Sequence, residues 1–362
     1  MAYTGINKQT EFFNTKLYDG DGSSTHAITG VGHQPDWVWI KKRDGVENHF
    51  VFDAVRGQSK YIYPNSGSVQ GTSASGVFKS FDSDGFTVAN NDGVNENNKD
   101  FVSWNWKAGG GQGSSNTDGS LNTTYTSVNT TSGISISQYT GVGGSGGTNA
   151  TIGHGLGAVP QVVIIKQLNQ SRDWVMSHQP LCESLGDYTR YMTINSTAAV
   201  SGAGNVLFQS SAFTSSVFNV GTSAATNGSG GANFIAYCFA EKPGFSKFGI
   251  YNGEGSSYPF IYTGFKPSWL FIKRTDSSGD NSVILDVKRD EIAIPNRTNP
   301  LTEGLFPNTD AAETGNYTTD FLSNGFKLKT TASAINGSGA SYLYMAFGQS
   351  LVGSNNVPCT AR

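Results

Sequence analysis

The sequence predicts an all-β protein made of three tandem antiparallel β-sandwich domains, of jelly-roll or lectin-like type, each about 105 residues long. Three observations predict this fold. Glycine supplies 46 of the 362 residues and only 14% of residues are charged, a balance typical of short strands joined by turns. One apolar strand pattern occurs three times at a domain-sized spacing. The length is sufficient for three domains that each bury a core.

The repeated pattern is a proline followed by an apolar run that ends in lysine. It occurs as PDWVWIK from Pro35, PQVVIIK from Pro160 and PSWLFIK from Pro267. A proline at the first residue, followed by β-branched and aromatic residues, predicts a buried strand. Because side chains alternate along a strand, Trp37 and Trp39 share one face, and Trp269 and Phe271 repeat this arrangement in the third copy.

Each closing lysine is followed, 12 or 13 residues later, by another polar residue. The lysines are Lys41, Lys166 and Lys273, and the later residues are Asp53, His178 and Asp286. The lysine and aspartate could form a ligand site or an ion pair across neighbouring strands, worth roughly 0.2–1 kcal/mol if exposed. We favour the ion pair, since duplicated positions more often preserve a fold than an active site. The prediction is an approach within about 4 Å in the first and third copies.

Other features keep the same order in each copy. A tyrosine precedes a glycine-rich turn, a phenylalanine lies in a short strand, and a last strand ends in a large aromatic residue. These residues are Tyr18, Tyr139 and Tyr251; Phe86, Phe218 and Phe326; and Trp106, Phe239 and Phe347. One face of the last strand is large in every copy, and we expect it to fill the core of each domain.

These features set the boundaries of three units. Unit one spans residues 1–107, unit two spans 134–241 and unit three spans 248–349. The segment 108–133 is rich in Gly, Ser, Asn and Thr, which predicts an extended or flexible linker. The join 242–247 is short, so we expect units two and three to pack together and unit one to have more freedom. A tail follows at 350–362.

Composition argues against several classes of function. The net charge of −3 gives no basic field for nucleic acid. No secretory pattern and no apolar run near ~20 residues occur, which predicts synthesis in the cytoplasm without membrane insertion. The three cysteines have no metal-binding spacing and are expected as free thiols. The histidines do not cluster, so we expect no metal, no cofactor and no catalytic site.

Aromatic residues supply 12% of the chain and allow two interpretations. Four of the six tryptophans belong to the repeated strands of unit one, which favours core filling. Exposed aromatic rings also bind sugars in many β-sandwich modules. Such a platform would lie in a loop that does not repeat, either 184–191 or 251–258.

The motifs SFDSDGF, GHGLGAVP, YCFAEKPGFSKFG, YTGFKPSWLFIKR, DFLSNGFKL and VPCTAR occur in this order along the chain. With the repeated strand, this set resembles a family of repeat-containing virion structural proteins of marine tailed bacteriophages, often labelled tail fibre or structural protein. The similarity covers essentially the whole chain. The resemblance implies a place on the virion exterior, synthesis in the host bacterial cytoplasm, other virion proteins of the capsid or tail as partners, and no catalytic residues.

Two positions on a particle compete. A tail fibre normally has an N-terminal anchor and a trimeric stalk, and the sequence shows neither heptads nor an anchor ahead of its first predicted strand. We therefore favour capsid decoration or a head fibre, and expect a homo-oligomer. The alternative is a tail fibre or receptor-binding adhesin for host attachment that recognises surface glycans. A polysaccharide depolymerase would show two carboxylates about 5–10 Å apart in a cleft. It is remote, because its usual β-helix architecture needs short repeats, whereas the repeat here is the size of a domain.

Overall fold

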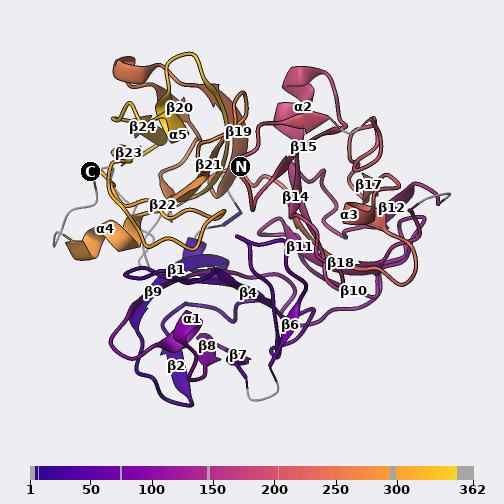
Figure 1. The fold of residues 1–362 in the computed structure, drawn as a ribbon, viewed down its shortest axis with the longest axis horizontal. Coiled ribbons are helices and arrows are strands. Elements are labelled where there is room, and N and C mark those ends of the chain that lie inside the picture. The colour runs from indigo at the N-terminus through magenta and orange to yellow at the C-terminus, as the bar shows by residue number, and fades with distance from the viewer. Residues whose placement is uncertain are drawn as a thin grey trace.

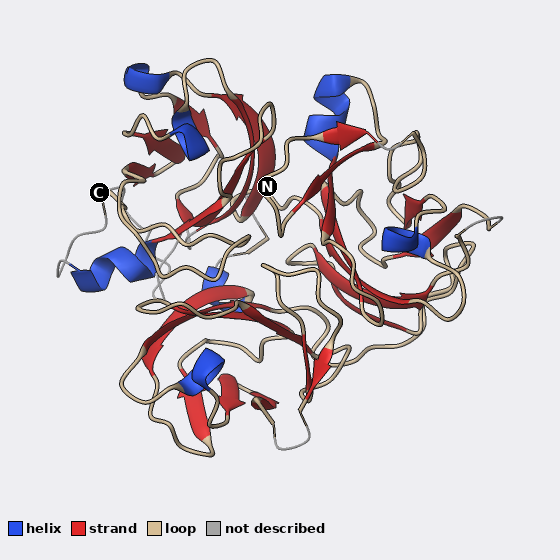
Figure 2. Cartoon of the chain, viewed as in Figure 1, coloured by secondary structure: helices blue, strands red, loops and turns tan. Residues whose placement is uncertain are grey.

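The structure is a computed structural model that describes residues 5–6, 8–73, 76–144, 147–202, 204–293 and 299–348. The protein is mostly β, with 39% strand and 9% helix, and its sheets are antiparallel (Figure 2). The all-β prediction is confirmed at this level. Three parts of the chain surround a common centre (Figure 1) and are called units one, two and three below, with the strand from the predicted linker counted in unit two.

Unit one contains a main sheet that faces the centre and a smaller outer sheet. The main sheet has the order β1 (Phe13–Asp19), β9 (Asp100–Trp106), β3 (Trp37–Lys42) and β4 (Phe50–Asp53). The outer sheet has the order β2 (His26–Thr29), β8 (Gly85–Val88) and β7 (Phe78–Asp82). The remaining elements are η1 (Gln9–Glu11), β5 (Lys60–Tyr61), β6 (Gly71–Thr72) and α1 (Asp92–Asn95).

Unit two repeats this plan with extra strands. Its main sheet runs β10 (Tyr125–Asn129), β11 (Ile134–Thr140), β18 (Asn233–Phe239), β13 (Val162–Gln167), β14 (Val175–His178), β15 (Arg190–Thr193) and β16 (Ser201–Gly202). Its outer sheet pairs β12 (Ala150–Gly153) with β17 (Val217–Val220). The helices are α2 (Gln179–Leu185) and α3 (Ala224–Asn227).

Unit three has a four-stranded main sheet and a three-stranded outer sheet. The main sheet runs β19 (Ser246–Asn252), β25 (Ser341–Gly348), β21 (Pro267–Arg274) and β22 (Val283–Asp286). The outer sheet runs β20 (Phe260–Tyr262), β24 (Gly325–Leu328) and β23 (Thr319–Leu322). The helices are η2 (Gly255–Ser257), α4 (Val287–Ala293) and α5 (Ser333–Asn336).

The repeated strand has the same surroundings in all three units. Strands β3, β13 and β21 each lie between the last strand of the unit and a hairpin partner. The register against the last strand is also shared, because equivalent residues pair in each unit: Trp37 with Trp106, Val162 with Phe239, and Trp269 with Phe347. The prediction of a buried strand is confirmed, because every residue of β3 and β13 is buried.

The large face of these strands does not fill a separate core in each unit, so that expectation is wrong. The large faces of the three main sheets meet in one shared core. The ring centres of Trp106 and Trp269 lie 5.5 Å apart, and those of Phe239 and Phe347 lie 6.1 Å apart. The physical reason is that both faces of each main sheet are apolar. One face packs on the outer sheet of its own unit and the other packs on neighbouring units.

Each unit also has its own smaller core between its main and outer sheets. In unit one, the rings of Phe52 and Phe78 stack with centres 4.5 Å apart. In unit two, Cys238 is a buried member of this smaller core, and its thiol is free. Cys182 is also free and buried, whereas Cys359 lies outside the described residues.

The predicted flexible linker contains regular structure, and the predicted freedom of unit one is wrong. Strand β10 lies within 108–133 and pairs with β11. The backbone N–H groups of Ala108 and Gly110 donate to the Asp36 carboxylate at 2.7 and 2.9 Å. Glycine here allows close approach as well as flexibility, since a Cβ on Gly113 would lie 1.9 Å from a backbone oxygen. Unit one also contacts unit three through the stacked rings of Phe13 and Phe347.

A tyrosine and an asparagine fix the glycine-rich turn of each unit. The hydroxyls of Tyr18, Tyr139 and Tyr251 donate to the carbonyls of Val94, Thr226 and Ile335. The next residue in each case is an asparagine, whose side-chain oxygen accepts from a backbone N–H of the turn; these are Asn95, Asn227 and Asn336. The recurring tyrosines therefore attach the turn to a short helix.

Candidate functional site: the contacts between units

The residues at the Asp53 position reach from one unit into another. The Asp53 carboxylate of unit one accepts the Tyr237 hydroxyl of unit two at 2.7 Å. The His178 Nε2 of unit two lies 3.2 Å from the Tyr344 carbonyl oxygen of unit three. Because a carbonyl oxygen only accepts, this nitrogen carries the proton and donates the hydrogen bond. The Asp286 carboxylate of unit three accepts the Trp104 indole N–H of unit one at 3.0 Å. These contacts form a closed cycle around the shared core.

A buried arginine accompanies each of the two carboxylates. Arg56 Nε lies 2.5 Å from Asp53 Oδ2, and Arg289 Nε lies 2.6 Å from Asp286 Oδ2, with all four side chains at most 1% exposed. Burial opposes the charge on each guanidinium. The adjacent carboxylate outweighs burial, so the pKa values of Arg56 and Arg289 rise above the usual value.

The sequence contains a signal for these pairs, because Asp-x-x-Arg occurs at both places, as DAVR from Asp53 and as DVKR from Asp286. The spacing from the repeated lysines identifies the aspartates but not the arginines three residues later. In unit two the matching residues are His178 and Leu181, and there the His178 ring accepts the Leu181 backbone N–H at the start of α2.

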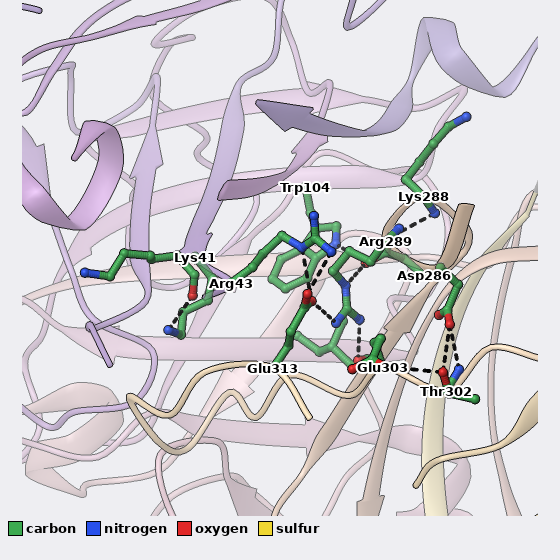
Figure 3. Close-up of polar contacts among 12 residues, drawn as sticks. Lys41, Arg43, Trp104, Asp286, Lys288, Arg289, Thr302, Glu303 and Glu313 are labelled. Carbon is green, nitrogen blue, oxygen red and sulfur yellow. Dashed lines mark hydrogen bonds and ion pairs between the residues drawn. The ribbon is translucent and has the colours of Figure 1, made fainter. Parts of the chain in front are cut away.

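A glutamate extends the Asp286 pair into unit one (Figure 3). Arg43 Nη2 lies 2.7 Å from Glu313 Oε1, and Arg289 Nη1 lies 3.3 Å from Glu313 Oε2. Glu313 therefore joins an arginine of unit one to an arginine of unit three. Because these side chains are mostly buried, removal of one member leaves an unbalanced charge in a poorly solvated place.

The predicted lysine–aspartate pairs do not form, so that prediction is wrong. The strand register places Asp53 opposite Trp37, at the far end of β3 from Lys41. Each lysine instead donates to backbone carbonyl groups. Lys41 reaches the Gly45 carbonyl at 3.2 Å, Lys166 reaches Gly67 of unit one at 3.1 Å, and Lys273 reaches Ser196 of unit two at 2.7 Å.

Burial changes the proton affinity of these lysines and of two histidines. It lowers the pKa of Lys41, Lys166 and Lys273 to about 8 in each case. It lowers the pKa of His33 and His178 to about 4, so both imidazoles are neutral near pH 7. These groups are enclosed and hydrogen-bonded to the backbone. Within the described ranges, no group of three His, Cys, Asp or Glu residues is arranged to hold a metal ion.

One surface pocket lies between units two and three. It is lined by Leu185 of α2, Ile250 of β19 and Asp276, among other residues. Asp276 is its single lining carboxylate, and Arg274 and the Ser341 backbone N–H both donate to it. The paired carboxylates that glycoside hydrolysis needs are therefore missing from the described lining of this pocket. Every described helix is also too short or too polar to cross a bilayer.

The fold and its contacts define an all-β protein whose three parts are joined by buried aromatic rings and buried Asp–Arg pairs. The chain belongs to the family described as a domain of unknown function, DUF7483, whose model matches residues 8–350. No curated protein matches the sequence.

Proposed function

We propose that this protein is a non-enzymatic structural component on the exterior of a tailed bacteriophage particle, as a capsid decoration protein or head fibre. The resemblance of its ordered motifs to virion structural proteins motivates this location. We also propose that its three units are sandwiches copied from one ancestral unit. The shared position of β3, β13 and β21 supports that origin.

The observation that carries the proposal is the use of buried charge. Each of the buried pairs Asp53–Arg56 and Asp286–Arg289 is hydrogen-bonded to an aromatic side chain of another unit, through a tyrosine hydroxyl in the first case and an indole N–H in the second. Perturbed ionisable groups often mark catalytic sites, but here they join parts of one fold. A protein built to hold its shape on a particle surface would place them in this way.

A second candidate is an adhesin that recognises host surface glycans, as part of a tail fibre. The observation in its favour is a run of exposed aromatic residues on and before β20, namely Tyr258, Phe260 and Tyr262. Tyr258 ends the predicted loop 251–258, one of the two loops considered for a sugar platform.

Immunogold labelling of purified particles with antibody against the full chain tests the location. Label over the head supports decoration, and label at the tail tip supports the adhesin. Particles that carry no label while the lysate contains the protein would contradict a virion role. Glycan arrays and a depolymerase assay on the purified protein separate a structural role, an adhesin and an enzyme, since only the depolymerase shortens the polysaccharide.

A further inference from the structure

Strand β20 lies at the edge of the outer sheet of unit three, on the side away from the shared core (Figure 1). Its hydrogen bonds to β24 involve alternate residues, as shown by the contacts of the Pro259 carbonyl and the Thr263 N–H with β24 and its turn. The N–H and C=O groups of Phe260 and Tyr262 therefore point away from the sheet. Among the described residues, no strand pairs with this side of β20.

The side chains of β20 are aromatic where the equivalent strands have small residues. Ile261 is buried, whereas Phe260 is 44% exposed and Tyr262 is 63% exposed. Strands β2, β12 and β20 can be aligned by the residue in each that pairs with Phe86, Phe218 or Phe326. This alignment gives Ala27 and Thr29 in unit one, and Thr151 and Gly153 in unit two, at the places of Phe260 and Tyr262.

The protein covers the equivalent edge in unit two with its own chain. Leu121 forms a bridge with Ile152 of β12, and the Leu121 N–H donates to the Thr151 carbonyl at 3.1 Å. The Ser120 N–H also donates to the Thr151 hydroxyl at 2.8 Å. An extended segment therefore fits beside this edge of the outer sheet. An apolar edge without such a cover is a template for pairing with another chain.

We propose that β20 pairs with β20 of a second copy of this chain, antiparallel and related by a two-fold axis near Ile261. In this register Phe260 lies opposite Tyr262 of the second copy. The two residues exchange both backbone hydrogen bonds, because their N–H and C=O groups already point outward. Their rings lie on the same face of the joined sheet, so each copy contributes to two cross-strand aromatic contacts. The interface is self-complementary, as a two-fold dimer requires.

A second copy accounts for more of the observations than a carbohydrate does. A sugar would stack on the rings but would leave the outward N–H and C=O groups of Phe260 and Tyr262 without strand partners. A second β20 uses both the rings and the backbone edge. This pairing uses the β20 edge alone and does not depend on where the protein acts.

Sedimentation velocity of the full chain over a concentration series, up to about 1 mM, tests the proposal. We expect a monomer–dimer equilibrium. The variant Phe260→Lys/Tyr262→Lys should raise the dissociation constant at least tenfold, because it places charges where rings would pack. The matched control Ala27→Lys/Thr29→Lys adds the same charges at the equivalent edge of unit one and should leave the constant unchanged.

Hydrogen exchange provides a second measurement that needs no substitution. The amides of Phe260 and Tyr262 should exchange more slowly as the protein concentration rises, whereas the Ile261 amide should not change. A wild-type chain that stays monomeric overturns the proposal, as does a dimer that the β20 variant leaves intact. A monomer that binds glycans, with binding lost in the β20 variant, would assign the strand to a carbohydrate instead.

Discussion

Because the three units share one core, unit one cut from the chain should not fold as a monomer. The perturbation is expression of residues 1–107 alone. In the full chain the rings of Trp37, Trp39, Trp104 and Trp106 are at most 4% exposed and belong to the shared core. Removing units two and three would expose the sides of these rings that face Tyr237, Phe239, Trp269 and Phe347.

The magnitude follows from the area of the rings. A buried tryptophan removes ~150–250 Å² from water, worth ~4–6 kcal/mol at about 25 cal/mol per Å². If half of that area faces other units, four tryptophans lose about 8–12 kcal/mol. This loss is similar to the whole stability of a typical domain, which is about 5–15 kcal/mol. The fragment should therefore unfold or aggregate.

Tryptophan fluorescence, near-ultraviolet circular dichroism and size exclusion measure the outcome. We expect emission shifted to the red, weak near-ultraviolet signal and a broad or aggregated elution profile. A control fragment with threonine in place of the four tryptophans keeps the unit's own core and should aggregate less. A wild-type fragment that elutes as a monomer and melts cooperatively would refute the shared-core reasoning.

Three further predictions concern buried charge. Arg289→Met should cost about 3–5 kcal/mol in urea unfolding, since it leaves Asp286 buried without its arginine, and Asp286→Leu combined with Arg289→Leu should recover most of this loss. The exposed control Lys8→Met should change stability by less than about 0.5 kcal/mol. If Arg289→Met and Lys8→Met lose the same stability, the proposed role of the Asp286–Arg289 pair is contradicted. The folded pKa of His178, about 4, lies below its usual 6.5, so the unfolded state binds protons first and stability should fall by up to ~3 kcal/mol from pH 6.5 to 4. His178→Asn retains a cap for α2 and should flatten this pH dependence; an unchanged slope in urea titrations would exclude His178 as its source. For Lys166, with pKa about 8 against a usual 10.5, stability should rise between these pH values, and Lys166→Met should lack that part of the rise if the amine causes it.

Much of the fold could be predicted from the repeated strand. The spacing from proline to lysine indicates a strand in each unit, and the register of β3, β13 and β21 agrees between units. The direction of the large face could not be predicted, because both faces of these strands are apolar. A pattern of period two identifies a buried face but does not say whether the partner is another sheet of the same unit or another unit.

The candidate site could be predicted less well. The positions of Asp53, His178 and Asp286 drew attention, but the pairing with lysine required a register in which Lys41 lies opposite Asp53. The turn between β3 and β4 closes earlier, so Asp53 lies opposite Trp37. Composition also gave no sign of β10, since the same Ser- and Thr-rich residues suit a mobile segment and an ordered strand.

The contact between Phe13 and Phe347 has a consequence for biosynthesis, because it joins the first described strand to the last described strand. Unit one leaves the ribosome while about 240 residues of the chain up to Phe347 are still to be made, which takes roughly 10–50 s at ordinary elongation rates. During this interval its tryptophan face has no partner. The nascent chain should therefore depend on chaperones until β25 emerges, and slower translation should lower the yield of soluble protein.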